Sequence, residues 1–490
     1  MQGKWGKRAA QIFLLGAMFT GLGLSLGKTI PTQAARPALV PSGVTTVFGI
    51  DEGGVLGFND EAVALASATG VYWTRAEISW NALESVEGVY NFTQAATSIN
   101  RLSGAGLSPV IYIADNPQWA SNKRCGPLYA DKVTAFANTM TVLAAQFPQV
   151  SVWALYNEVD RSLNPGEGAG CFGGQDLNEN NTKDSHDYAV MLAAAWKAVH
   201  DANPNARVAV GALAFDNFDE ASAPATYPGG GNGGKFNYNF PGELFTYMKN
   251  HPLPPGQKYM DMVLFNYYDI YGRYWEANAP GRGIQAKAAA LKKKMQSGGI
   301  PVVPLFVTET GEDSISIGSQ GQAHCLDITF VRGAAAKLAG VVWWTFQDFP
   351  DDADWPYNTW KFGIVNQNRQ PKLSYNALVT LTTELNGYVY KKTLSNTANL
   401  RGVEAYRFAK GKSAKFVVWS STYQSTSYDP ECSWPRVSKL AKFDAKKIRV
   451  VDYLGNAKTV KDNSKKDKDK TGGKIGIIVT GSPQIVQINP

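Results

Sequence analysis

Val152-Trp-Ala-Leu-Tyr-Asn-Glu-Val159 is an apolar run that closes on a polar pair, Asn157 and Glu158. A second run, Leu305-Phe-Val-Thr-Glu-Thr-Gly311, places Glu309 near its end in the same way. A glutamate that ends a hydrophobic strand contributes little to packing, because charged groups are rarely buried without a partner. The position suits chemistry instead, provided that the two runs are strands of one sheet.

The sequence around these runs repeats one pattern. Between about residues 44 and 386, short apolar runs alternate with amphipathic stretches, in which apolar residues recur at spacings of three and four. Near-continuous apolar runs are typical of parallel strands that are covered by helices. Strands are predicted at 46–50, 71–76, 108–113, 151–156, 208–213, 261–266, 303–308 and 340–345, and helices at 60–69, 92–104, 130–147, 186–202, 241–250, 284–297, 323–338 and 373–385.

Eight such units predict an α/β fold, a (β/α)8 TIM barrel over residues 36–386. Glu158 then ends the fourth strand and Glu309 the seventh. Because the carboxyl ends of barrel strands converge on one pocket, the two carboxylates should face each other across its mouth. Paired carboxylates are what glycosidic bond cleavage requires.

After about residue 387 the pattern changes to short alternating runs separated by turns, such as 403–408, 414–419, 448–453 and 475–479. We therefore expect a small antiparallel, sandwich-like β domain over residues 387–490. It is either a structural appendage of the barrel or a carbohydrate-binding module. The mixed-sign run 461–470 is expected to be a solvated loop, or else a patch that attracts acidic polymers.

The N-terminal residues 1–35 have the layout of an export signal. Lys4, Lys7 and Arg8 precede an uncharged apolar stretch that extends to residue 27, and the small residues Ala34 and Ala35 follow. The protein is therefore expected to be secreted or held at the cell surface. The stretch is nearly long enough to span a bilayer, so an uncleaved anchor stays open, and it is the only membrane association expected.

The cysteines and histidines argue against a metal or a cofactor. The four cysteines are widely spaced without a CxxC pair, and the four histidines lie in or near predicted helices. In an exported protein Cys125 and Cys171 are candidates for a disulfide, whereas Cys325 falls in a helical stretch and is expected to be buried. The net charge of +7 comes without a basic helix that carries interleaved aromatics, so no nucleic-acid partner is expected, and no protein partner is predicted.

Short motifs give a family resemblance. The Asn157-Glu158 pair at strand four and Glu309 at strand seven resemble the catalytic marks of the retaining clan A glycoside hydrolases. The segment Asn116-Pro-Gln-Trp-Ala-Ser121 is similar to family 39 of that clan, with family 5 as second choice. Family 5 would place a histidine two residues before the tyrosine of strand six, where this chain has Asn266 before Tyr268.

The resemblance implies a secreted retaining hydrolase of O-glycosyl compounds that degrades a poly- or oligosaccharide by double displacement, with Glu158 as acid/base and Glu309 as nucleophile. Such roles require environments that push the two pKa values apart.

Supporting roles follow from the same resemblance. Asn157 would bind the sugar 2-hydroxyl, and Arg75 would hold Glu309 ionised. Tyr268 would orient Glu309, or Tyr267 would if the strand phase shifts by one residue. One of the adjacent Trp343 and Trp344 would lie under the sugar ring, with Trp344 favoured. The remaining candidates for contacts with substrate are Trp119, Asp51 and Glu77.

Two other functions stay open. A non-catalytic carbohydrate-binding protein on the same barrel would keep the aromatic residues and lose a catalytic carboxylate. A transglycosylase would use the same residues and exclude water from the covalent intermediate.

Overall fold

The computed structural model describes residues 39, 47–51, 59–162, 170–228, 234–351, 360–421, 432 and 437–490. Pro37–Pro490 form one compact unit. The predicted export signal at 1–35 lies outside the described residues. Among the helices that are described, none combines the length and the hydrophobicity that a membrane span needs.

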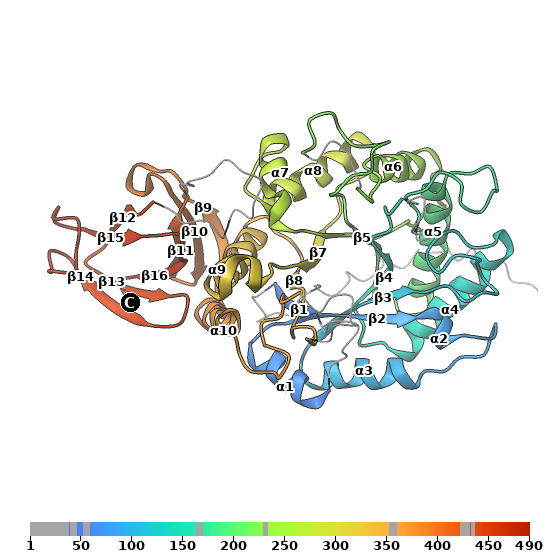
Figure 1. Ribbon diagram of the computed structural model, residues 1–490, viewed down its shortest axis with the longest axis horizontal. Helices are drawn as coiled ribbons and strands as arrows, with labels where there is room; N and C mark the ends of the chain where they lie inside the picture. The colour runs from blue at the N-terminus through green and yellow to red at the C-terminus, as the bar shows by residue number, and fades with distance from the viewer. Residues whose placement is uncertain are drawn as a thin grey trace, which may run out of the picture. The chain divides into compact units, whose positions relative to one another are not determined.

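Eight parallel strands close into a barrel in sequence order, with β8 pairing back to β1 (Figure 1). The predicted (β/α)8 fold is therefore confirmed. Its strands are β1 (Phe48–Asp51), β2 (Trp73–Ser79), β3 (Ser108–Ala114), β4 (Val152–Asn157), β5 (Arg207–Leu213), β6 (Met262–Asn266), β7 (Leu305–Thr310) and β8 (Val341–Trp343).

Helices follow the strands and surround the barrel (Figure 1). They are α1 (Asp60–Ala68), α3 (Thr93–Gly104), α4 (Val133–Gln146), α5 (Asp184–Ala202), α6 (Phe240–Asn250), α8 (Ile284–Ser297), α9 (Ser314–Ala335) and α10 (Leu373–Leu385). Two short helices, α2 (Trp80–Leu83) and α7 (Gly272–Asn278), are additional to the prediction. The helix predicted at 323–338 begins earlier, because Asp313 caps α9 and the chain then passes through a non-helical Gly318.

Side-chain alternation along the strands builds two apolar layers. On β4, Val152 and Ala154 belong to the cluster inside the barrel, whereas Trp153 and Leu155 belong to the larger cluster that includes the helices. This alternation is the period-two pattern of a regular strand. The alternation determines which side chains point into the barrel mouth at the carboxyl ends of the strands.

The C-terminal part consists of antiparallel sheets, as predicted. A six-stranded sheet has the order β14-β13-β16-β11-β10-β9, and β12 pairs with β15. These strands are β9 (Val389–Thr393), β10 (Val403–Lys410), β11 (Ser413–Ser420), β12 (Lys439–Asp444), β13 (Lys447–Asp452), β14 (Ala457–Lys461), β15 (Lys474–Val479) and β16 (Gln484–Ile488).

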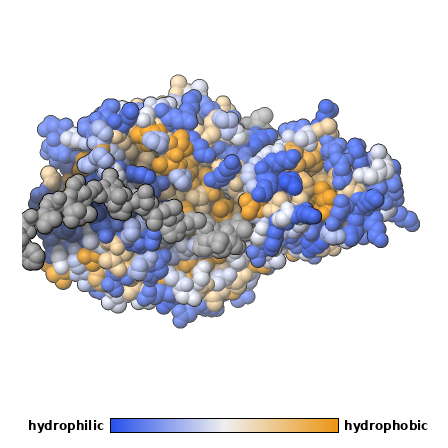
Figure 2. Space-filling view, turned by 180° about the vertical axis from the view of Figure 1, so that it is seen from behind, coloured by the Kyte–Doolittle hydropathy of each residue, from blue (hydrophilic) through white to orange (hydrophobic). Residues whose placement is uncertain are grey.

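The charged run after β14 folds back on itself. The carboxylate of Asp467 accepts backbone N–H groups of Asn463, Asp469 and Gly476 at 2.8–2.9 Å, while most lysines of the run are exposed. Figure 2 shows a predominantly hydrophilic surface over the β domain. The run is therefore a solvated loop whose backbone is organised around the buried Asp467.

Two disulfides crosslink the chain. Cys125 pairs with Cys171, the pairing that the sequence suggested. Cys325 is buried in α9, as expected, and in addition it pairs with Cys432 over a separation of 107 residues, a disulfide that the sequence did not suggest. A buried ion pair lies on the same helix, where Arg332 Nη2 contacts Glu404 Oε1 of β10 at 2.7 Å. Together these contacts attach the β domain to the barrel.

Candidate active site

The end of β4 departs from regular strand geometry, and this departure presents two polar side chains at once. Tyr156 has a φ of 63° and Glu158 a φ of 50°. Regular alternation would send the adjacent Asn157 and Glu158 to opposite faces. With two residues in the left-handed region the alternation is broken, and both side chains reach the barrel mouth, where they line one cavity.

The neighbouring strand accommodates this irregular segment because it carries a glycine. A Cβ on Gly211 of β5 would lie 2.0 Å from the carbonyl oxygen of Leu155 and 2.5 Å from that of Tyr156. The Tyr188 hydroxyl donates to Leu155 O and accepts from Gly211 N, each at 2.8 Å. A side-chain hydroxyl thus bridges two backbone groups of the strands, as buried backbone groups require.

Glu309 accepts hydrogen bonds from three parts of the barrel, namely β2, β4 and the segment that follows β6. Arg75 Nη1 and Asn157 Nδ2 donate to Glu309 Oε1 at 2.5 and 3.2 Å, and the Tyr268 hydroxyl donates to Oε2 at 3.1 Å. Hydrogen bonds to the charged form of a carboxyl favour that form. The predicted contacts of Arg75 and Tyr268 with Glu309 are therefore present, and the alternative Tyr267 instead donates to Asp269.

Arg75 brings a permanent positive charge to this carboxylate. The guanidinium is 4% exposed and also contacts Asp51 Oδ2 at 3.1 Å. Burial lowers the pKa of Arg75, but Glu309, Tyr112 and Asp51 together outweigh it and raise the pKa above its ordinary value. The ring of Tyr112 lies 4.3 Å from the guanidinium carbon, and its hydroxyl donates to Glu77 at 2.7 Å.

Glu158 has the opposite environment. Its Oε1 accepts one hydrogen bond, from Asn266 Nδ2 at 3.2 Å, and the Thr308 hydroxyl donates to Asn266 Oδ1 and so orients that amide. Burial and then the neighbouring Glu309 carboxylate raise the pKa of Glu158 to about 7, against the lowering effect of Asn266. The two carboxyl groups thus have contrasting surroundings, with three donors on Glu309 and one amide donor on Glu158.

Asn157 contributes a second polar atom. Its amide nitrogen donates to Glu309, while its Oδ1 is buried and has no hydrogen-bond partner in the part of the chain that the structure describes. Buried polar atoms are almost always paired. Such an acceptor beside Glu309 suits a sugar hydroxyl, which is the role that the resemblance implies for Asn157.

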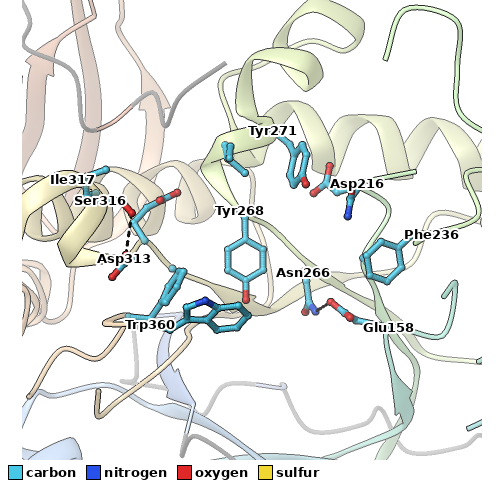
Figure 3. Close-up of a pocket in the computed structure, with 16 residues that line it drawn as sticks. Glu158, Asp216, Phe236, Asn266, Tyr268, Tyr271, Asp313, Ser316, Ile317 and Trp360 are labelled. Atoms are coloured by element: carbon cyan, nitrogen blue, oxygen red, sulfur yellow. Dashed lines mark hydrogen bonds between the residues drawn. The ribbon is translucent and has the colours of Figure 1, made fainter. Parts of the chain in front are cut away.

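Two cavities meet at Glu158. The smaller has a volume of about 710 Å³ and contains Asp51, Arg75, Glu77, Asn157 and Glu309. The larger, about 1030 Å³, extends past Asn266 to the start of α9. Figure 3 shows Glu158 and Asn266 at one side of it and Asp313, Ser316 and Ile317 at the other, with Tyr268 and Trp360 between them. The residues common to both cavities are Glu158, Tyr268, Trp360 and Phe362.

The predicted aromatic residues have different locations. Trp344 lines the smaller cavity, and Trp343 is buried with its indole N–H on Phe362 O at 2.9 Å, so the favoured choice agrees with the geometry. Trp119 does not join them. Its indole N–H donates to Glu84 O at 2.9 Å and its ring packs edge-on against Trp80, because the turn after β3 directs it to that layer.

Sequence reasoning missed two contributors. Asn266 was noted only where a family pattern was broken, although its place at the end of β6 was a usable signal. Trp360 follows a stretch that the structure does not describe, and nothing in its local sequence marks it. It packs edge-on against Trp344 at 5.8 Å between ring centroids and lines both cavities.

Comparisons with known proteins bear on the fold. No family model and no curated protein matches the chain. Among solved structures, a family 39 glycoside hydrolase from the gut symbiont Bacteroides cellulosilyticus has a TM-score of 0.64 at 16% identity, over 91% of this chain and 81% of that one. A monomeric β-xylosidase from Caulobacter crescentus has a TM-score of 0.57 at 14% identity, over 93% of this chain and 97% of that one.

A family 30 endoxylanase from Clostridium papyrosolvens has a TM-score of 0.54 at 13% identity, over 91% of this chain and 98% of that one. Coverage of about nine-tenths of the chain means that the likeness includes the barrel and the C-terminal β domain. The chain therefore shares the fold of these family 39 and family 30 glycoside hydrolases, as the motifs suggested. At these identities the likeness concerns the fold.

Proposed function

We propose that the protein is an exported retaining O-glycoside hydrolase that cleaves a poly- or oligosaccharide by double displacement. The observation that carries the proposal is the contrast between two facing carboxyl groups. Glu309 accepts from Arg75, Asn157 and Tyr268, whereas Glu158 accepts one amide and has a pKa raised to about 7.

The mechanism follows from that contrast. Glu309 attacks the anomeric carbon of a sugar in the smaller cavity, while Glu158 gives its proton to the oxygen of the departing group. A covalent glycosyl-enzyme forms on Glu309. Glu158, now ionised, takes a proton from water, which attacks the same carbon and restores both carboxyl groups. Two inversions leave the configuration of the sugar unchanged.

The supporting residues act on this cycle. Asn157 would accept the 2-hydroxyl of the sugar through its unpaired Oδ1, a contact that strengthens in the transition state. Trp344 would form an apolar wall for the ring in the smaller cavity. Carbohydrate substrates in the medium fit the export that residues 1–35 suggest, so we place the protein outside the cell or on its surface.

A panel of nitrophenyl glycosides incubated with the purified protein tests the proposal. Hydrolysis of at least one member is expected, with retention of configuration seen by proton NMR. The isosteric Glu158→Gln and Glu309→Gln variants should each lose most of that activity. Activity that persists in both variants would show that the proposed site is not the site of hydrolysis.

A further inference from the structure

The larger cavity has a defined place in the proposed reaction. Glu309 lines only the smaller cavity, so the ring that it attacks lies there. Glu158, which protonates the departing oxygen, lines both cavities. The sugar on the leaving-group side of the cleaved bond therefore enters the larger cavity.

Several carboxyl groups line the larger cavity. Its described lining contains Glu158, Asp216, Glu312 and Asp313, and no lysine or arginine. In the smaller cavity the described lining has one cation, Arg75, which is committed to Asp51 and Glu309.

Between residues 51 and 360, the four stretches that lie outside the described residues also lack lysine and arginine in their sequence, namely residues 52–58, 163–169, 229–233 and 352–359. A carboxylate or sulfate on the substrate would therefore find no lysine or arginine among the described lining residues of the larger cavity, so nothing there would offset the cost of desolvating the anion.

Two of the acids in the larger cavity are satisfied by the protein. Asp216 forms a buried ion pair with Lys287 and accepts the Trp275 indole N–H at 2.6 Å. Asp313 caps α9, where it accepts backbone N–H groups of Ile315 and Lys361 at 3.1 and 3.0 Å. These carboxylates have structural roles that need no ligand.

Glu312 differs from both. It follows Gly311 just after β7 and is 9% exposed, yet its Oε1 is buried without a hydrogen-bond partner among the described residues. Burial and the nearby Asp269 and Asp313 raise its pKa well above the ordinary value, and a backbone hydrogen bond with Asp269 only partly offsets this. Leaving a buried carboxyl oxygen unpaired is unfavourable, so the protein is expected to gain when a ligand supplies the donor.

We propose that Glu312 binds the sugar on the leaving-group side of the cleaved bond, and that this compartment accepts neutral or amino sugars and rejects acidic ones. The donors that suit Glu312 are sugar hydroxyl groups or a sugar ammonium group. The proposal rests on the glycosidase function above and adds to it a substrate class and a specificity-determining residue.

A binding experiment tests the predicted preference for neutral and amino sugars over acidic ones. The full chain with Glu158→Gln, which keeps the shape of the site, is applied to a glycan array with neutral, amino and acidic oligosaccharides. Binding confined to neutral or amino glycans is expected. Binding of uronate-containing or sulfated glycans, or binding of none, contradicts the proposal.

Kinetics test Glu312 itself, with an oligosaccharide cleaved by the wild type and the nitrophenyl glycoside of the same sugar. The nitrophenyl group offers no hydroxyl or ammonium donor, so Glu312→Ala should reduce kcat/KM for the oligosaccharide at least about tenfold more than for the nitrophenyl glycoside. Glu312→Gln keeps an acceptor but not a carboxylate. It should therefore retain the wild-type kcat/KM for a neutral oligosaccharide and lose it for an amino oligosaccharide. Glu220→Gln, an exposed acid outside both cavities, is the matched control.

Equal losses on both substrates would assign Glu312 a structural role and overturn the proposal, as would no loss on either. A wild-type protein that cleaves no nitrophenyl glycoside is a different failure, since it counts against the glycosidase function itself.

Discussion

The change Glu158→Gln tests the assignment of the proton donor. An ordinary glutamate, with a pKa of 4.5, would be about 0.3% protonated at pH 7, whereas a pKa of about 7 leaves about half of Glu158 protonated. The site thus supplies roughly 150-fold more acid at neutral pH than an exposed glutamate would. Since only the protonated form donates, wild-type kcat/KM should fall about tenfold between pH 6 and pH 8.

Glutamine at position 158 can still accept from Asn266 but has no proton that titrates. For a sugar or nitrophenyl leaving group we expect kcat/KM to drop by about 10²–10⁴ and the alkaline limb near pH 7 to disappear. The leaving group of a dinitrophenyl glycoside needs no proton. For this substrate, Glu158→Gln should therefore reduce the rate of the glycosylation step by a smaller factor. The assay is kcat/KM from pH 5 to pH 9 for wild type, Glu158→Gln and the control Glu220→Gln. An alkaline limb near pH 7 that survives in Glu158→Gln would refute the assignment.

Four further substitutions test the residues that position the two carboxyl groups and the contacts that stabilise the fold. Asn266→Ala removes an amide that lowers the pKa of Glu158, so the alkaline limb of kcat/KM should move to higher pH, and a move to lower pH would contradict this. Arg75→Met leaves two buried carboxylates uncompensated, so denaturant titration should show a loss of about 3–5 kcal/mol in unfolding free energy, together with lost activity. Gly211→Ala places a Cβ 2.0 Å from a carbonyl oxygen of β4, so we expect a loss of about 1–3 kcal/mol in unfolding free energy and a lower kcat. A wild-type kcat would show that the irregular backbone at the end of β4 is not needed for activity. Cys432→Ser should lower the unfolding free energy by about 2–5 kcal/mol, an effect that should vanish when both proteins are reduced.

The barrel could be predicted from the sequence because the same strand-and-helix pattern occurs eight times. Few folds allow eight apolar strands to form a parallel sheet that amphipathic helices cover. The same pattern placed Glu158 and Glu309 at the carboxyl ends of their strands and so at the barrel mouth. The favoured choices of Tyr268 and Trp344 agree with the geometry for the same reason, since strand alternation orders neighbours at a strand end.

Features that depend on tertiary packing were not readable. The positive φ angles of Tyr156 and Glu158 depend on Gly211 of the next strand, 55 residues after Tyr156 (211 − 156), and no local motif encodes them. The Cys325–Cys432 disulfide joins a helix to a segment of the other domain, and sequence spacing cannot give such a pairing. Trp119 lies in a motif that suggested the pocket, but its indole N–H is bound to a backbone carbonyl elsewhere.

The most direct test of the central claim is the chemical identity of the covalent intermediate. The protein is incubated with 2,4-dinitrophenyl 2-deoxy-2-fluoroglycosides of several sugars, which form the glycosyl-enzyme and slow its hydrolysis, and the labelled peptide is sequenced by tandem mass spectrometry. The account predicts one fluorosugar per chain, on Glu309 within the peptide that contains Thr308-Glu309-Thr310. A label on Glu158, or turnover of the parent sugar with inversion and no label, would contradict it.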